Sequence, residues 1–230
     1  VQRAAVYAVA VQCEGMCDME QLQAQAKAPL AVREEGETLV VETLYGEKHL
    51  PRQTVLAERC RSCKTKKMAC YDELLGEDGT DCGDGRMEGV RRLEAMTPDE
   101  RFRFWQGELS RCIRCNACRN VCPACSCEKC VFDNPASGVE NKAAANSFEE
   151  NLFHIIRAFH VAGRCTDCGE CSRVCPQHIP LHLLNRKLIA DMNELYGPYQ
   201  AGADLESRPP LMDFRFDDPE PSTARRGGAQ

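Results

Sequence analysis

The sequence predicts an α+β fold, with strands near the N-terminus and helices around two cysteine-rich runs farther along the chain. The β-prone segments 3–11 and 38–44 both lie in the first part of the chain. Three helical patterns follow, and residues 112–123 and 165–176 repeat one cysteine spacing. We therefore expect an N-terminal small α/β region bearing cysteines at 1–95, a helix-flanked, ferredoxin-like domain at 96–197, and an extended tail at 198–230.

The two strand segments are predicted from their composition and boundaries. Residues 3–11 are almost all apolar and β-prone, which is typical of a buried strand. Thr38–Leu44 is a second such run and is bounded by Gly36 and Gly46. Residues 76–89 are rich in glycine and aspartate, and this composition indicates a loop.

The first helix is predicted to begin at Thr97 and to end near Ser110. Threonine can cap a helix, Pro98 suits its first turn, and Glu100 completes a capping-box pattern. We expect this helix to bury three apolar side chains: Phe102, Trp105 and Leu109.

Two more helices are predicted from apolar stripes at helical spacing. One extends from about Ser147 to Ala162 and ends at Gly163, and the other extends from about Pro180 to Tyr196. Their expected apolar faces are Leu152, Phe153, Ile156 and Phe159 in the first, and Leu181, Leu184, Leu188, Met192 and Leu195 in the second.

The two cysteine runs both have the spacing C-x2-C-x2-C-x3-C-P, which is typical of a ferredoxin-type iron–sulfur site. In such a site three closely spaced cysteines bind one cluster, and the fourth, before proline, binds the other. We expect one 4Fe–4S cluster on Cys112, Cys115, Cys118 and Cys175, and a second on Cys165, Cys168, Cys171 and Cys122. The alternatives are zinc sites, which usually show paired C-x2-C runs, or a disulfide framework, which suits small secreted domains.

Nine cysteines remain outside these two runs. Three of them, Cys13, Cys60 and Cys63, form a candidate third cluster site, with its fourth ligand among Cys17, Cys70 and Cys82. Three others, Cys125, Cys127 and Cys130, follow the first run directly and are candidate ligands of a further cluster or metal. We expect one or two additional 4Fe–4S clusters; the alternative is that these thiols are buried and pack as small hydrophobic groups.

Composition excludes several other kinds of protein. The 230-residue chain has 17 cysteines and a formal net charge of −6, which favours metal binding over disulfides and argues against a nucleic-acid partner. No apolar stretch approaches the ~20 residues of a membrane-spanning helix, and no secretion signal is visible. We expect a cytoplasmic protein without a direct membrane span. Since no GxGxxG motif occurs, we predict no flavin or nucleotide in this chain.

The histidines show no metal-ligand spacing with carboxylates. We therefore predict structural roles for His154, His160 and His182. His178 lies three residues after Cys175, and it is the histidine we expect to donate a hydrogen bond near a cluster.

The stretch Cys112–Cys130 resembles the four-iron dicluster domain of oxidoreductase electron-transfer subunits, and its CP-x-C-x-C run also occurs in the iron–sulfur subunit of anaerobic sulfite reductase. Over residues 5–200 the chain is similar to iron–sulfur beta-subunit-like proteins of formate dehydrogenase and deazaflavin-dependent hydrogenase systems. The shared N-terminal features are Val11–Gly15, Cys60–Cys63, Tyr71-Asp72 and Gly76-Glu77. The resemblance implies an additional cluster on Cys13, Cys60 and Cys63.

These observations lead us to expect a non-catalytic electron-transfer subunit of a multi-subunit oxidoreductase. It would relay electrons through two or more 4Fe–4S clusters to or from a partner subunit that carries flavin, molybdenum or tungsten, or nickel and iron. No nucleophile, base or oxyanion constellation is evident in the sequence. The alternative is a catalytic reductase subunit that uses an unusual cluster to reduce a small substrate such as sulfite or a disulfide.

Overall fold

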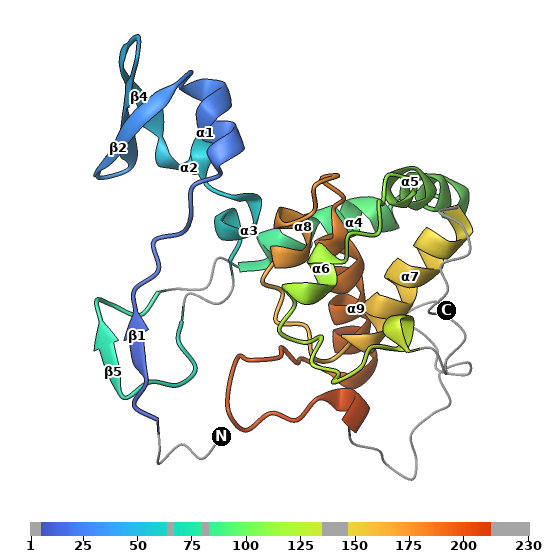
Figure 1. The fold of residues 1–230 in the computed structure, drawn as a ribbon. Helices are drawn as coiled ribbons and strands as arrows, with labels where there is room; N and C mark the ends of the chain where they lie inside the picture. The colour runs from blue at the N-terminus through green and yellow to red at the C-terminus, as the bar shows by residue number, and fades with distance from the viewer. Residues whose placement is uncertain (1–5, 64–66, 80–82, 135–146, 213–230) are drawn as a thin grey trace. The chain divides into compact units, whose positions relative to one another are not determined.

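The computed structural model describes residues 6–63, 67–79, 83–134 and 147–212, and it is mixed α+β, with small sheets and a helical part (Figure 1). The chain divides into two compact units, Val1–Arg86 and Met87–Gln230. Within the described ranges, no helix combines the length and the apolar character needed to cross a membrane.

The first unit is built on a three-stranded antiparallel sheet in the order β2 (Pro29–Glu35), β3 (Thr38–Thr43), β4 (Gly46–Pro51). Gly36 lies in the turn before β3, and Gly46 begins β4 directly after the next turn, both at positive φ. The predicted strand is confirmed, although it ends at Thr43 rather than Leu44. β2 and β4 were not predicted, because most of their side chains are exposed and many are charged.

The core of this unit lies between the central strand and two helices. Helix α1 (Met19–Gln25) is capped by Asp18, whose side chain accepts hydrogen bonds from the backbone N–H groups of Glu20 and Gln21. The short helix α2 (Arg52–Val55) follows β4, and α3 (Glu58–Arg61) follows α2. The buried core residues are Leu22, Ala26, Leu39, Val41 and Val55.

The predicted N-terminal strand is present but shorter and not buried. β1 (Val9–Val11) pairs in parallel with β5 (Glu73–Leu75), and Val9 and Val11 are 48% and 59% exposed. The expectation of a buried strand was wrong because β1 belongs to a two-stranded sheet rather than to the middle of a larger one. The beginning of the predicted segment, residues 3–5, lies outside the described residues.

The predicted loop at 76–89 contains regular structure at its end. A 3₁₀ helix, η2, covers Gly83–Met87, and α4 begins directly after it and covers Glu88–Glu94. Part of the loop prediction was therefore wrong: glycine and aspartate in this stretch did not prevent a tight helical turn from leading into α4.

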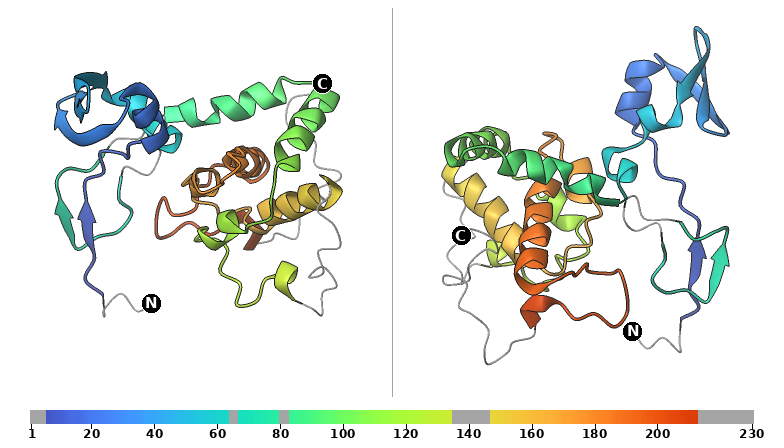
Figure 2. Two further views of the ribbon diagram at one scale, coloured as in Figure 1. Left: turned by 45° about the horizontal axis from the view of Figure 1, so that its top comes forward. Right: turned by 180° about the vertical axis from the view of Figure 1, so that it is seen from behind.

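The three predicted helices are confirmed as α5 (Pro98–Ser110), α7 (Ser147–His160) and α9 (Leu181–Tyr196). The Thr97 hydroxyl accepts from the Glu100 N–H, and the Glu100 carboxylate accepts from the Thr97 N–H at 2.9 Å, which is the predicted capping box. Helix α7 packs against both α5 and α9 (Figures 1 and 2).

The core of the second unit lies where these helices meet the cysteine runs. Short helices α6 (Ala117–Asn120) and α8 (Glu170–Arg173) contact each other, and α8 contacts α9. Two 3₁₀ helices, η3 (Val131–Asp133) and η5 (Pro210–Met212), complete the unit. The buried core residues are Leu109, Cys118, Phe153, Cys171, Ile179 and Leu181.

Several predicted apolar faces were only partly right. Leu109, Phe153, Leu181 and Met192 are buried, whereas Phe102 and Phe159 are each 63% exposed. Leu152 and Leu195 are also exposed. Helices α7 and α9 instead turn polar side chains inward, and these side chains approach the cysteine runs.

Candidate iron–sulfur centre

The two cysteine runs fold into loops with the same backbone conformation. The second residue after the first cysteine, Arg114 in one loop and Asp167 in the other, has φ of 53° and 57°. The residue after the second cysteine, Asn116 or Gly169, has φ of 61° or 71°, and a one-turn helix begins directly after it. The repeated sequence therefore produces a repeated structure.

Each loop aims a backbone donor at its first cysteine. The N–H of Arg114 donates to Cys112 Sγ at 3.3 Å, and the N–H of Asp167 donates to Cys165 Sγ at 3.4 Å. Hydrogen bonds of this kind favour a thiolate over a thiol and help to set the potential of a bound cluster.

Electrostatic interactions join thiols from the two runs. Burial raises the pKa of Cys118, and the thiols of Cys175 and Cys115 raise it further, while Arg157 lowers it. Burial also raises the pKa of Cys165 to about 12, with Cys171 and Cys122 contributing in the same direction. Each group of interacting thiols thus includes the proline-linked cysteine of the opposite run.

Cys122 also interacts with the next cysteine along the chain. A side-chain hydrogen bond from Cys125 lowers the pKa of Cys122 to about 5, although burial opposes this effect. The same interaction raises the pKa of Cys125, as does its burial. The opposite shifts of these two pKa values have one common cause, the contact between the Cys122 and Cys125 side chains.

Helix α7 presents two polar side chains to the first run. His154, 2% exposed, places its Nε2 atom 3.2 Å from Cys112 Sγ. Arg157, 4% exposed, donates from Nη2 to the carbonyl oxygen of Cys118 at 2.9 Å. Neither contact was predicted, because apolar periodicity assigns polar residues to the solvent face of a helix.

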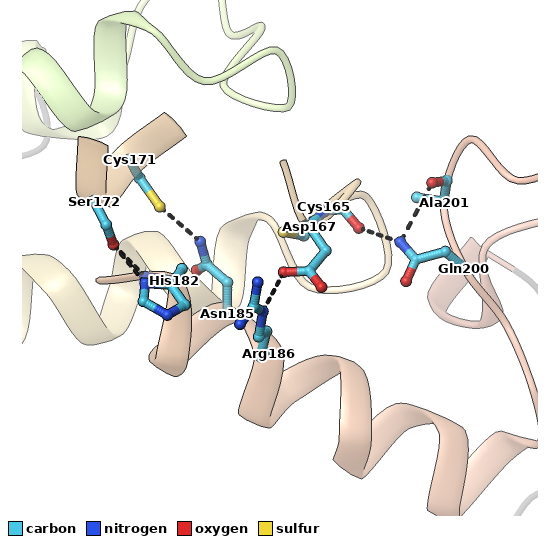
Figure 3. Close-up of polar contacts among 9 residues, drawn as sticks. All are labelled: Cys165, Asp167, Cys171, Ser172, His182, Asn185, Arg186, Gln200 and Ala201. Atoms are coloured by element: carbon cyan, nitrogen blue, oxygen red, sulfur yellow. Dashed lines mark hydrogen bonds and ion pairs between the residues drawn. The ribbon is translucent and has the colours of Figure 1, made fainter. Parts of the chain in front are cut away.

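Helix α9 presents polar side chains to the second run in the same way, as Figure 3 shows. The Nδ2 atom of Asn185 donates to Cys171 Sγ at 3.6 Å, and Arg186 forms a buried ion pair with Asp167 at 2.7 Å. The Gln200 side chain donates to the carbonyl oxygen of Cys165 at 3.1 Å. Side chains from α9 and from Gln200 therefore hold the second cysteine loop in place.

A histidine that we expected to be structural, His154, contacts the sulfur of Cys112. Its position in the sequence could not indicate this contact, because the two residues are 42 positions apart. His178 is exposed, and its backbone N–H donates to the carbonyl oxygen of Cys175. The hydrogen bond that we expected from His178 near a cluster stays a prediction.

In the first unit, the structure brings together part of the predicted N-terminal set. The backbone N–H of Met16 donates to Cys60 Sγ at 3.4 Å, and burial raises the pKa of Cys17, with Cys60 among the groups that raise it further. Cys13 and Cys70 are exposed, Cys63 is half-buried, and Cys82 lies outside the described residues.

Two residue pairs that carry the family resemblance, Tyr71-Asp72 and Gly76-Glu77, contact the N-terminal segment around β1. The carboxylate of Asp72 accepts from the Ala8 N–H at 2.8 Å, and the Glu77 N–H donates to the Gln12 side chain at 3.0 Å. Gly76 has φ of 102°, and a Cβ atom there would come within 2.5 Å of Gln12. These contacts fix the stretch that leads into Cys13.

The third predicted group lines a pocket of about 470 Å³ in the second unit. Its walls include Cys125, Cys127 and Cys130, together with the cationic or basic side chains of Arg119, Lys129, Arg157, His160 and Arg164.

The donors in the second unit fit iron–sulfur clusters. In the described ranges, no three His, Cys, Asp or Glu side chains are placed to hold a single metal ion. A 4Fe–4S cluster differs from a single ion, because each of its four thiolates binds a different iron. Soft thiols in paired loops, with N–H groups directed at sulfur, are suited to that chemistry.

Comparison with known proteins agrees with this reading. Residues 108–179 match the family described as the 4Fe-4S dicluster domain. The chain is 32% identical over 110 residues to the F420-dependent formate dehydrogenase subunit beta of Methanocaldococcus jannaschii, covering 48% of this chain and 28% of that protein. It is 33% identical over 107 residues to the F420-dependent formate dehydrogenase 1 subunit beta of Methanococcus maripaludis, covering 46% and 26%.

The chain thus spans little more than a quarter of the length of these relatives. Residues 108–179, which match the domain family, include the paired loops described above. A dicluster domain implies two 4Fe–4S clusters. The chain contains a 4Fe–4S dicluster domain, and it is a distant homologue of the F420-dependent formate dehydrogenase beta subunits.

Proposed function

We propose that this chain is the electron-transfer iron–sulfur subunit of a cytoplasmic, multi-subunit oxidoreductase. When bound, its two 4Fe–4S clusters supply one-electron transfer. The proposed ligands are Cys112, Cys115, Cys118 and Cys175 for cluster one, and Cys165, Cys168, Cys171 and Cys122 for cluster two. The observation that carries this proposal is the pair of matching loops, whose interacting thiols include the fourth cysteine of the opposite run.

The chain's own residues hold and tune these sites. The N–H groups of Arg114 and Asp167 favour thiolates at the first position of each loop. Side chains of α7 and α9 approach the sulfur atoms from within the fold, and their burial excludes water from that side. Water exclusion strengthens these interactions, because the local dielectric is low.

We further propose a third cluster on Cys13, Cys60 and Cys63, with Cys17 as the fourth ligand. The interaction between Cys17 and Cys60 supports this choice over Cys70, which is exposed. Cys60→Ser should lower the iron and acid-labile sulfide content by one cluster, whereas the matched variant Cys70→Ser should leave it unchanged. Equal losses in both variants would contradict the assignment of Cys17.

The proposed partner is a subunit that carries flavin or a metal active site, with formate or a deazaflavin as the ultimate electron donor or acceptor. The names of the two relatives support this proposal. The test is anaerobic preparation of the full chain, iron and sulfide analysis, and EPR spectroscopy after reduction. We expect about eight irons from the dicluster domain and about four more from the proposed third cluster. Cys175→Ser and Cys122→Ser should each disrupt a different cluster of the dicluster domain. About four irons or fewer would contradict the relay.

A second candidate function is supported by the pocket beside the first run. Three thiols and several cationic side chains line it, so that a further cluster there could meet a small anion such as sulfite. Adding sulfite to the reduced protein should then change its EPR spectrum. Unchanged spectra at saturating sulfite would exclude this catalytic role and leave the relay intact.

A further inference from the structure

Arg157 is a buried cation without a carboxylate partner in the described parts of the chain. Its side chain hydrogen-bonds the Cys118 carbonyl oxygen, and its Nε atom is buried with no hydrogen-bond partner. Burying a charge costs several kcal/mol unless an opposite charge compensates it. The negative charge that compensates Arg157 must therefore come from other neighbouring groups.

Those neighbours are the sulfur atoms of both cysteine runs. Arg157 hydrogen-bonds the carbonyl oxygen of Cys118, and Cys118 packs with Cys171 of the second run in one buried cluster of the core. Burial acts to lower the pKa of Arg157, but the sulfur atoms of Cys118, Cys171, Cys125 and Cys122 raise it above the ordinary value. In return, the guanidinium lowers the pKa of Cys118, which belongs to the proposed cluster one, and of Cys171 and Cys122, which belong to the proposed cluster two. One fixed positive charge thus acts on both cluster sites.

We propose that Arg157 is a shared tuning residue, which raises the reduction potentials of both clusters from a single buried position beside Cys118, where the two runs pack together. Adding an electron makes a cluster more negative, and a nearby cation in a low-dielectric interior favours that reduced state. This inference rests on the proposed ligand sets, because it assigns Cys118 to one cluster and Cys171 and Cys122 to the other.

Two other buried side chains each contact a ligand of one proposed cluster. His154 contacts Cys112, which belongs to cluster one, and Asn185 contacts Cys171, which belongs to cluster two. These two side chains provide matched controls for Arg157, since each is buried and each should affect one cluster only.

The experiment uses the full chain, prepared anaerobically with its clusters, and a potentiometric titration followed by EPR. Arg157→Met keeps much of the side-chain length but removes the charge, Arg157→Gln keeps a hydrogen-bond donor without charge, and Arg157→Lys keeps the charge. We expect Met and Gln to lower the reduction equilibrium constant of both clusters about tenfold, which is 59 mV for a one-electron couple. Arg157→Lys should keep the reduction equilibrium constants of both clusters within about threefold of those of the unmodified chain, which is a smaller change than the tenfold one expected for Met and Gln.

The controls complete the pattern. His154→Leu should shift only cluster one, and Asn185→Leu should shift only cluster two. A purely structural role for Arg157 predicts unchanged potentials in variants that retain full iron content, and this result would overturn the inference. A shift of one cluster alone, or a Lys variant that behaves like Met, would also overturn it. Fewer than two clusters in the unmodified chain would instead refute the proposed function on which the inference rests.

Discussion

The Nε2 atom of His154 lies 3.2 Å from the sulfur of Cys112, so that helix α7 delivers a ring nitrogen to the first cysteine of the first run. An N–H donor stabilises negative charge on sulfur, and this charge is greater in the reduced cluster. The contact therefore connects the packing of a helix to the electronic properties of the proposed cluster one.

We predict that His154→Leu lowers the reduction equilibrium constant of that cluster about tenfold, or 59 mV for a one-electron couple. Potentiometric EPR of the purified chain measures this shift. Phe159→Leu, at a position of the same helix that is 63% exposed, is the control and should leave the potential unchanged. Equal shifts in both variants would mean that the sulfur contact has no specific effect.

A second prediction concerns the loop residue Gly169, which has φ of 71°. Gly169→Val places a β-branched side chain in the left-handed region, at a cost of about 1–3 kcal/mol. We expect lower iron and sulfide content and a lower unfolding temperature. Gly169→Asn should be nearly neutral, because Asn116 occupies the equivalent position of the other loop with φ of 61°. If Asn were as harmful as Val, left-handed strain would not be the cause.

A third prediction tests the packing of α7. Phe153 is buried against Phe132 and His154, and the Arg114 guanidinium lies 4.0 Å from its ring centroid. Phe153→Ala should lower the free energy of unfolding by about 3–5 kcal/mol. Phe159→Ala, on the same helix but 63% exposed, should change it by no more than about 0.5 kcal/mol. Urea unfolding followed by circular dichroism compares the two midpoints, and a larger effect at Phe159 would refute this burial pattern.

How much the sequence could predict depends on how local each signal is. The capping box at Thr97 and Glu100 and the glycine turns around Thr38–Leu44 act between near neighbours, and those elements were predicted correctly. The family resemblance was also correct, because the repeated cysteine spacing is specific. The cysteine ligand sets remain predictions.

The inward-facing polar residues could not be predicted from periodicity. His154 and Asn185 occupy buried helix positions where the partner is a sulfur atom, and Arg157 occupies one where the partner is the carbonyl oxygen of Cys118. Only the tertiary fold shows that these faces meet the cysteine loops. Phe159 continues the apolar stripe of α7 but is exposed, because the face of α7 that meets the cysteine loops is a different one. In a protein built around polar centres, the buried face of a helix need not be its most apolar face.

A final prediction concerns the buried ion pair between Arg186 and Asp167, whose side chains are 3% and 5% exposed. Arg186→Met leaves the Asp167 carboxylate without its buried cation, and we expect a loss of about 3–5 kcal/mol in the free energy of unfolding. The double variant Arg186→Met with Asp167→Asn removes both charges, so part of that stability should return. Asparagine also suits the left-handed conformation of residue 167, where φ is 57°.

Urea unfolding of the unmodified chain, both single variants and the double variant gives the coupling between the two residues. If the losses were simply additive, the pair would contribute no mutual stabilisation, and the position of Asp167 would depend on the backbone of the loop alone. A coupling of several kcal/mol would show that α9 fixes the second cysteine loop through this one contact. The loop's shape would then depend on a residue 19 positions beyond it.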